Sequence, residues 1–303
     1  MRHIIIARNL SKTYGTTKAL DNVDLSIDRN GVHLLLGPNG SGKSTFIKLC
    51  LGLIKPTSGF IKVLGFNPWS ERHVVSSKTS HVIEGANMPW WFSGQFYARM
   101  LSKLKGIEWE SIYEIASYLD VTSYWDKPIY TYSSGMRKKL LLSLGLVEGF
   151  QLYLLDEPFT LIDDQTKVKI LELVNRLSRK SVIIIATHVL LKKLSNVIES
   201  IIILSNGKVK AFIDKNNILG TVPLKISIKL HSLKELNNIL LILEKHRVSN
   251  IELNLENKVI SLMMPLDEWG KLRRRLIQGY RVHSVSIDVE RLYVDTMYYG
   301  ESG

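Results

Sequence analysis

Cysteine is almost absent from this chain of 303 residues, in which Cys50 is the single example. One thiol cannot build an internal disulfide framework, so the sequence excludes the small secreted folds that depend on several disulfides. The scarcity fits a reducing compartment. We expect Cys50 itself to be a small, buried, apolar side chain.

Long apolar runs are missing as well. The longest runs, such as residues 182–186, are only as long as a strand, whereas a membrane-spanning helix needs about 20 predominantly apolar residues. The chain starts with a basic and then apolar segment, but Arg8 interrupts it before a signal peptide could form. If the protein works at a membrane, we expect a separate chain to span it.

A long basic stripe is also missing, although 40 Lys and Arg against 28 Asp and Glu give a net charge of +12. Such an excess suits nucleic acid, anionic lipid headgroups or nucleotide phosphates. The clearest basic clusters, at 137–139 and 273–275, are short and carry no interleaved aromatic residues. We interpret both as solvated helix faces, with proximity to an anionic membrane as the second interpretation. We expect no nucleic-acid partner.

Strand and helix patterns alternate over residues 1–215, which predicts an α/β domain. The run at 32–36 ends at Gly37 and precedes a helical segment at 43–53. Two apolar strands at 152–155 and 182–186 enclose a helix at 164–179, an order that predicts a parallel sheet. Helical spacing from about 69 to 126 predicts a helical insertion. The Asn206-Gly207 pair predicts a hairpin between 201–204 and 208–212.

Residues 216–303 form a second predicted unit. Strand patterns at 224–230, 251–255, 259–263 and 282–287 alternate with helical patterns at 233–246 and 266–278. This βαββαβ order predicts a small α+β domain of the ferredoxin-like kind. Such a unit could stabilise the chain passively, aid dimerisation or regulate turnover.

The strongest motif is the glycine-rich segment 37–45, GPNGSGKST, between a strand and a helix. Its spacing is that of a phosphate-binding loop, in which glycines let the backbone N–H groups point at phosphate oxygens. The following helix adds its positive N-terminal end. We expect the lysine to reach the β- and γ-phosphates and the serine after it to ligate Mg²⁺. The predicted nucleotide-binding residues of this loop are Gly37, Asn39, Gly40, Ser41, Gly42, Lys43, Ser44 and Thr45.

A second motif is the acidic pair that ends the apolar strand 152–155. Asp156 is expected to hold Mg²⁺, directly or through water. Glu157 is expected to orient or deprotonate the attacking water. An acidic pair after a strand is a weak signal alone, but it gains weight beside a phosphate-binding loop.

Taken in order, these motifs resemble an ATP-binding cassette (ABC) ATPase, a P-loop NTPase with a mixed sheet and a helical insertion. The family's LSGGQ signature loop is similar to residues 132–136, YSSGM, where Ser133 and Gly135 match and Ser134 and Met136 depart. In the family this loop contacts the γ-phosphate bound by the other subunit. The resemblance covers residues 1–215.

Four further positions take roles from the resemblance. Residues 160–163 are similar to the family's dimer-contact loop, and His188 stands where the family keeps a switch histidine near the γ-phosphate. Tyr14 stands where the family stacks an aromatic ring on adenine. Glu84 takes the place of a family glutamine and is expected to contact Mg²⁺ or the attacking water, but its extra charge puts the fine tuning of hydrolysis in doubt.

The resemblance implies an ATP-binding and ATP-hydrolysing subunit that powers translocation, in the export direction, by a separate membrane permease. The aromatic segment near Glu84–Phe92 is expected to dock that permease, and ATP and Mg²⁺ are the implied cofactors. The subunit would form a homodimer, or pair with a second cassette, at the cytoplasmic face of the membrane as a peripheral protein.

Two rival functions are weighed against this one. A soluble cassette ATPase acting on ribosomes or DNA would carry two cassettes or a long coiled coil, and the chain has one phosphate-binding loop and no heptad run. The second rival is a regulatory module whose C-terminal unit senses a ligand and whose ATPase activity is secondary. The presence of Glu157 and His188 argues against an inactive ATPase.

Overall fold

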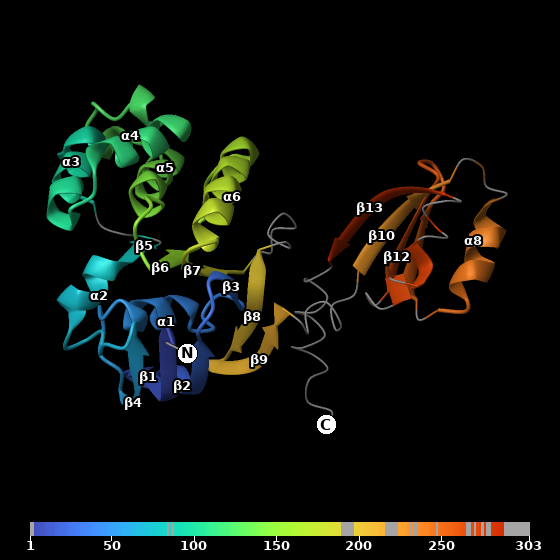
Figure 1. Cartoon of the computed structure of the whole chain (residues 1–303), viewed down its shortest axis with the longest axis horizontal. Helices are drawn as coiled ribbons and strands as arrows, with labels where there is room; N and C mark the ends of the chain where they lie inside the picture. Colours follow the sequence, from blue (N-terminus) through green and yellow to red (C-terminus); the bar gives the residue numbers. More distant parts are fainter. Residues whose placement is uncertain are drawn as a thin grey trace. The chain divides into compact units, whose positions relative to one another are not determined.

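The computed structural model describes residues 3–83, 85, 88–188, 197–215, 224–230, 232, 235–246, 248–264, 268–269, 271–273, 276 and 280–287. The chain divides into two compact units, Met1–His188 with Asn196–Phe212, and Val189–Ser195 with Ile213–Gly303. Each unit is described by itself (Figure 1). The predicted boundary at residue 215 stays a prediction.

A mostly parallel six-stranded sheet forms the centre of the first unit. Its order is β5-β6-β7-β3-β8-β9, and the four pairings from β5 to β8 are parallel. Every residue of β3, β6 and β7 is buried, as expected for strands that are covered on both faces. The strands are β3 (Gly31–Leu36), β5 (Thr79–Val82), β6 (Leu152–Asp156), β7 (Val182–Thr187), β8 (Ile198–Ser205) and β9 (Lys208–Asp214).

An antiparallel sheet of order β2-β1-β4 completes the mixed architecture. The strands are β1 (Ile5–Tyr14), β2 (Thr17–Ile27) and β4 (Ser58–Val63). The helix α1 (Lys43–Cys50) contributes Phe46, Ile47, Leu49 and Cys50 to the hydrophobic core that this sheet shares with the central strands. Cys50 is fully buried, as predicted, and burial raises the pKa of its thiol above the ordinary range.

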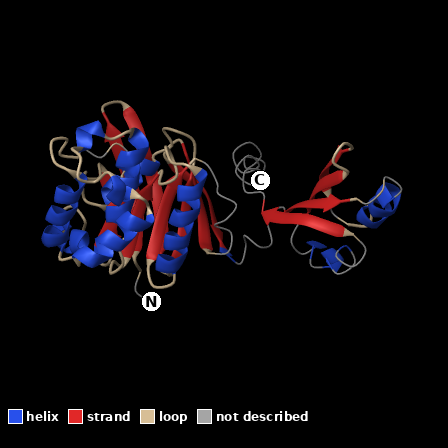
Figure 2. Ribbon diagram, turned by 90° about the horizontal axis from the view of Figure 1, so that it is seen from above, coloured by secondary structure: helices blue, strands red, loops and turns tan. Residues whose placement is uncertain are grey.

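Helices cover the strands and form a group beside the sheet (Figure 2). The prediction of a helical insertion from about 69 is wrong at its beginning, because β5 lies inside that range and pairs with β6 in the central sheet. Thr79 and Val82 of β5 are buried there. The helices of the first unit besides α1 are α2 (Arg72–Lys78), α3 (Gly94–Lys105), α4 (Trp109–Tyr118), α5 (Ser134–Gly145) and α6 (Asp164–Ser178), with 3₁₀ turns at Val121–Ser123 and Ile129–Thr131.

The second unit has the predicted ferredoxin-like topology. Its four-stranded sheet has the order β11-β12-β10-β13, and every neighbouring pair is antiparallel. Apolar residues of β10, β12 and α8 form a separate core, which Leu272 and Leu276 of the second predicted helix join. The elements are β10 (Leu224–Lys229), α8 (Glu235–Leu243), β11 (Ser249–Asn254), β12 (Val259–Met264) and β13 (Arg281–Ile287).

Candidate functional site

The segment between β3 and α1 curls into a cradle whose backbone conformation favours glycine at two positions. Gly40 and Gly42 have φ angles of +80° and +107°, which side-chain-bearing residues rarely adopt. A Cβ atom on Gly42 would lie 2.4 Å from the carbonyl oxygen of Ala19. On Gly37 it would lie 2.2 Å from the carbonyl oxygen of Leu204. The spacing of the motif therefore reflects both backbone conformation and close packing.

Lys43 holds this cradle in shape from inside. Its side chain is 6% exposed, and Nζ donates hydrogen bonds to the carbonyl oxygens of Gly37 at 2.7 Å and Pro38 at 3.1 Å. The N–H group of Ser41 also donates to Pro38. Lys43 is the first residue of α1, so the positive end of the helix and the ammonium group meet at the same place.

A cavity of about 270 Å³ opens over the cradle. It collects most of the predicted nucleotide-binding residues and Glu157, which lies far away in the sequence. Tyr14, 45% exposed, stands at the cavity with Lys12 Nζ 5.1 Å from its ring centre. The lining residues are Tyr14, Ala19, Asn39, Gly40, Gly42, Lys43, Ser44, Thr45 and Glu157.

The acidic pair lies at the end of β6, beside the end of β7. Asp156 is 1% exposed, and Glu157 is 6% exposed with a φ angle of +46°. The Oε2 atom of Glu157 accepts a hydrogen bond from Thr187 Oγ1 at 3.0 Å, and its Oε1 atom lies 2.9 Å from His188 Nδ1. The carboxylate is thus fixed between two side chains of the neighbouring strand end. A left-handed conformation at a glutamate costs about 1–3 kcal/mol and is typical of a functional position.

The residues present fit a magnesium nucleotide. The cradle offers backbone N–H groups and a lysine ammonium to phosphate oxygens. The hydroxyl of Ser44 and the carboxylate of Asp156 are hard oxygen donors, the type that Mg²⁺ prefers. Of the acidic pair, Glu157 lines the cavity, whereas Asp156 lies directly before it and is buried.

The predicted signature loop, residues 132–136, lies at the start of α5 and does not line this cavity. Ser133 caps the helix by accepting a hydrogen bond from the N–H group of Met136 at 3.2 Å. A Cβ atom on Gly135 would lie 2.9 Å from the carbonyl oxygen of Leu161, so the signature loop packs against the predicted dimer-contact loop. Neither Ser133 nor Gly135 lines the cavity over the phosphate-binding loop.

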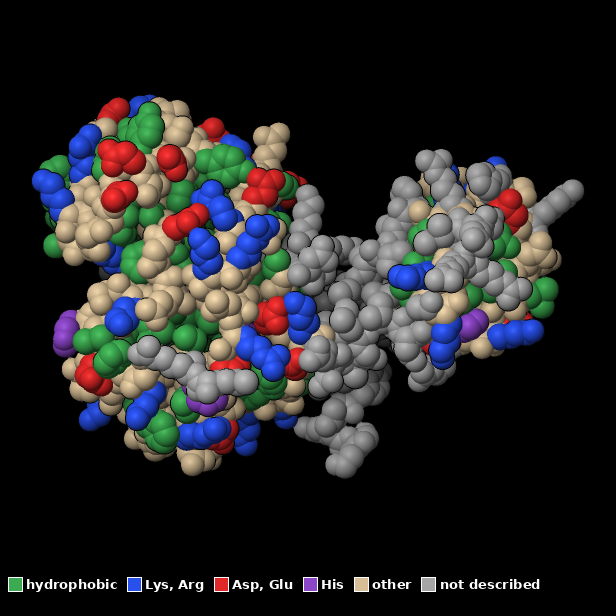
Figure 3. All heavy atoms as spheres, viewed as in Figure 1, with side chains coloured by type: hydrophobic (Ala, Val, Ile, Leu, Met, Phe, Trp, Pro, Cys, Tyr) green, Lys and Arg blue, Asp and Glu red, His purple; other side chains and the backbone are tan. Residues whose placement is uncertain are grey.

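The basic residues after the signature loop are not a solvated helix face, so that prediction is wrong for 137–139. Lys138 is only 6% exposed, and its Nζ donates to the carbonyl oxygen of Asp156 at 3.4 Å. Lys139 forms an ion pair of 3.0 Å with Asp163, whose carboxylate caps α6. Helix α5 is thereby tied to the strand end that carries the acidic pair. Elsewhere on the first unit, Lys and Arg are interspersed with Asp and Glu on the face shown in Figure 3.

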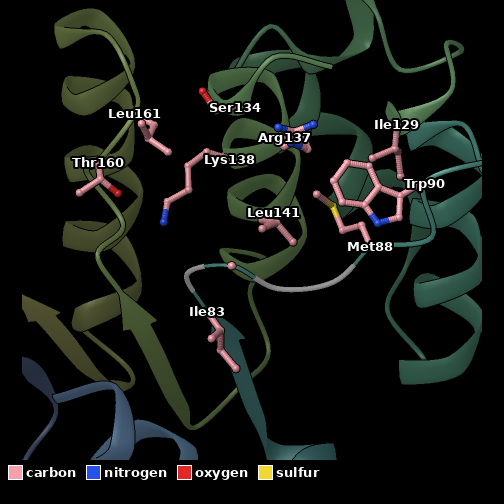
Figure 4. A pocket seen from close by; sticks show the side chains of 11 residues that line it. Ile83, Met88, Trp90, Ile129, Ser134, Arg137, Lys138, Leu141, Thr160 and Leu161 are labelled. Atoms are coloured by element: carbon pink, nitrogen blue, oxygen red, sulfur yellow. The ribbon is translucent and has the colours of Figure 1, made fainter. Parts of the chain in front are cut away.

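A second cavity, also about 270 Å³, lies between α5 and the segment that follows β5 (Figure 4). Its walls are mostly apolar, and Arg137 adds a guanidinium 5.2 Å from the ring centre of Trp90. The neighbouring Trp91 is 73% exposed. Glu84 lies outside the described residues. The lining residues are Ile83, Gly85, Met88, Trp90, Ile129, Ser134, Arg137, Lys138, Leu141, Thr160 and Leu161.

Sequence reasoning missed the roles of two residues at this site. Ala19 lines it from β2, but a small apolar residue gives no chemical signal in a sequence. Thr187 orients Glu157 through its hydroxyl, and its place directly before His188 was the only available hint.

Comparisons with known proteins give a consistent result. A family model described as "ABC transporter" matches residues 20–160. The probable ABC transporter ATP-binding protein in the ycf23-apcF intergenic region of Cyanophora paradoxa is 32% identical over 190 residues, 59% of this chain and 76% of that protein. The daunorubicin/doxorubicin resistance ATP-binding protein DrrA of Streptomyces peucetius is 30% identical over 67% of this chain, a match that spans only 62% of DrrA. The bacitracin transport ATP-binding protein BcrA of Bacillus licheniformis is 25% identical over 92% of this chain and 91% of BcrA.

Solved structures share the fold. The ATP-binding subunit of an ABC transporter superposes with a TM-score of 0.64 at 24% identity, covering 71% of this chain and 91% of that one. The dimeric cassette MJ0796 bound to ADP and Pi superposes with a TM-score of 0.62 at 22% identity, covering 70% and 98%. Among the described residues, the helices are too short or too polar to cross a bilayer. The cradle, the fixed carboxylate and these relatives together place the chain in the ABC transporter family, among its ATP-binding subunits.

Proposed function

We propose that two copies of this chain form a head-to-tail homodimer with ATP at two shared sites. Each ATP would lie between the phosphate-binding loop of one copy and Ser133 of the other. The observation that supports this arrangement is the separation within one chain: the cavity holds Lys43 and Glu157, while Ser133 and Gly135 lie elsewhere. A second copy supplies the missing wall. ATP then favours the closed dimer because it binds that state better than the open one.

Within each site, different residues bind the nucleotide and activate the attacking water. Glu157 accepts the proton of the attacking water, and Thr187 and His188 hold its two oxygens in place. His188 stabilises the charge that develops on the γ-phosphate, and the Lys43 ammonium binds the β- and γ-phosphates. Ser44 and Asp156 would hold Mg²⁺, which neutralises phosphate charge when it is bound. Tyr14 would stack on the adenine ring.

The second cavity is the proposed docking site of a separate membrane permease. A pocket with apolar walls and one guanidinium suits a short amphipathic segment of a partner. Thr160 and Leu161 line this pocket and lie three and four residues after Glu157, so opening of the dimer can be transmitted to the partner. The relatives named for drug resistance and for bacitracin transport support export. We place the subunit peripherally, at the cytoplasmic face of the membrane.

The catalytic assignment is tested with Glu157→Gln. The substitution preserves shape and removes the proton acceptor, so ATP binding should persist and turnover should fall by about 10²–10⁴-fold. The matched control is Glu110→Gln, an exposed glutamate in the first turn of α4, which should hydrolyse ATP at the normal rate. Normal hydrolysis by Glu157→Gln contradicts the assignment of the base.

The partner is tested by affinity purification of the tagged chain from detergent-solubilised membranes. A stoichiometric multi-helix membrane protein should co-purify, and Trp90→Ala should reduce its yield. Trp69→Ala is the control, because Trp69 is 48% exposed and Trp90 is 47% exposed. Recovery with ribosomes or DNA, and without a membrane protein, contradicts the transport role while leaving the ATPase chemistry intact.

A further inference from the structure

The second unit exposes an apolar stripe along one edge of its sheet. Strand β11 is the last strand on that side of the order β11-β12-β10-β13, so one of its edges faces no other strand of the described chain. Ile251, Leu253 and Leu255 are exposed by 43%, 45% and 62%. An exposed sheet edge with apolar side chains is a template for pairing with another strand.

The stripe is continuous with the core of the unit. Leu253 pairs with Ile260, which is fully buried, whereas Glu252 pairs with Ser261 on the opposite face. Directly opposed residues of an antiparallel pair share a face. Leu253 is therefore a core-face residue at the rim of the sheet.

Strand β11 also lacks most of the features that usually prevent an edge strand from pairing with another chain. Natural edge strands are often blocked by lysine, proline or a bulge. The segment 249–255, SNIELNL, contains no lysine, arginine or proline. A register shift between Ser249 and Glu252 leaves Glu252, Leu253 and Asn254 as the regular stretch. Leu253 is the middle residue of that stretch.

We propose that β11 pairs antiparallel with β11 of a second copy of this chain, about a two-fold axis at Leu253. Leu253 then faces the partner's Leu253, and Glu252 faces the partner's Asn254, so an apolar pair is flanked by two hydrogen-bonding pairs. An axis at Glu252 would place two glutamates directly opposite each other, which is unfavourable. The two four-stranded sheets join into one, and Leu253 of each copy is buried between the two cores.

This interface goes beyond the proposed catalytic function and needs no nucleotide. A two-fold axis is also the symmetry of a dimer of two identical cassettes, so the two interfaces have the same symmetry. The second unit would keep two copies associated while the cassettes open, which raises the effective concentration for the next closure.

The test is cross-linking of full-length Leu253→Cys in nucleotide-free buffer. The native Cys50 is fully buried, so the introduced thiol is the reactive one. Lys43→Ala is added to remove nucleotide-driven pairing. Mild oxidation should give a disulfide-linked dimer that a reductant converts back to monomer. The control Leu241→Cys places a thiol on α8 at a residue that is 60% exposed, and it should stay monomeric on the gel.

A charge substitution gives an independent measurement. Leu253→Lys places two ammonium groups opposite each other and should weaken nucleotide-free dimerisation at least about tenfold in analytical ultracentrifugation, whereas Leu241→Lys should not. A Leu253→Cys thiol that reacts with maleimide but never cross-links overturns the proposal. A nucleotide-free wild-type chain that stays monomeric at tens of micromolar also overturns it. Neither result affects the catalytic proposal, which is tested through Glu157.

Discussion

Substitution of Gly42 by alanine tests the packing of the phosphate-binding loop. At a φ angle of +107° an alanine is strained by about 1–3 kcal/mol. Its methyl group would also lie 2.4 Å from the carbonyl oxygen of Ala19 and 2.7 Å from Leu20 Cδ2. Forcing extra volume into a packed site costs about 1–3 kcal/mol more. We expect Gly42→Ala to lose about 2–6 kcal/mol of stability in total.

Gly40→Ala is the matched control in the same loop. Gly40 also has a positive φ angle, +80°, but no heavy atom lies within 4 Å of the position of its added Cβ. It should lose only the backbone part, about 1–2 kcal/mol. One kcal/mol corresponds to about 2–4 °C in a domain of this size. Gly42→Ala should therefore melt at least about 2–4 °C below Gly40→Ala.

The assay is thermal unfolding without nucleotide, followed by titration with a fluorescent ATP analogue. Gly40 lines the cavity, so Gly40→Ala should lose affinity for the analogue although its fold is only mildly destabilised. Equal melting temperatures for the two variants would refute the argument that Gly42 is required by its contact with β2. Normal affinity of Gly40→Ala would refute the placement of phosphate in the cradle.

Three further predictions follow from single contacts. Thr187→Val removes the hydroxyl that donates to Glu157 Oε2. Because a hydrogen bond to a charged group contributes about 1.5–3 kcal/mol, kcat should fall roughly 10–100-fold while KM for ATP changes little. An unchanged kcat contradicts the positioning role. Asp163→Ala removes the carboxylate that caps α6 through the N–H group of Thr166 and should cost about 1 kcal/mol in urea denaturation. Asp164→Ala, one residue further on, removes only an exposed ion pair with Lys167 and should cost less. Hydrogen bonds from His246 and then Lys271 lower the pKa of Glu268 from 4.5 to about 2. The charged carboxylate therefore stabilises the fold above about pH 4.5, and this contribution disappears as the pH falls towards 2. The difference in stability between wild type and Glu268→Gln should shrink over that range, and a difference that grows on acidification contradicts the lowered pKa.

Strand limits show where local patterns are sufficient. The apolar strands at 152–155 and 182–186 were predicted to within about one residue of β6 and β7, because a strand buried on both faces is apolar at every position. Strand β1 runs from Ile5 to Tyr14, well beyond its apolar first residues. Its second half is polar and partly exposed, and antiparallel pairing with β2 extends it there. Such pairing leaves little trace in a single-sequence pattern.

The phosphate-binding loop, the acidic strand end and the βαββαβ order are determined by the sequence alone. They depend on local requirements: glycine where the backbone needs a positive φ angle, and periodic apolar residues where one face is buried. The tertiary structure alone decided that Thr187 holds Glu157, that Lys138 is buried against the acidic strand end, and that Leu253 stays exposed at a sheet edge. These contacts join residues that are distant in the chain, so they depend on strand order and side-chain packing. Neither can be inferred from local patterns in a single sequence.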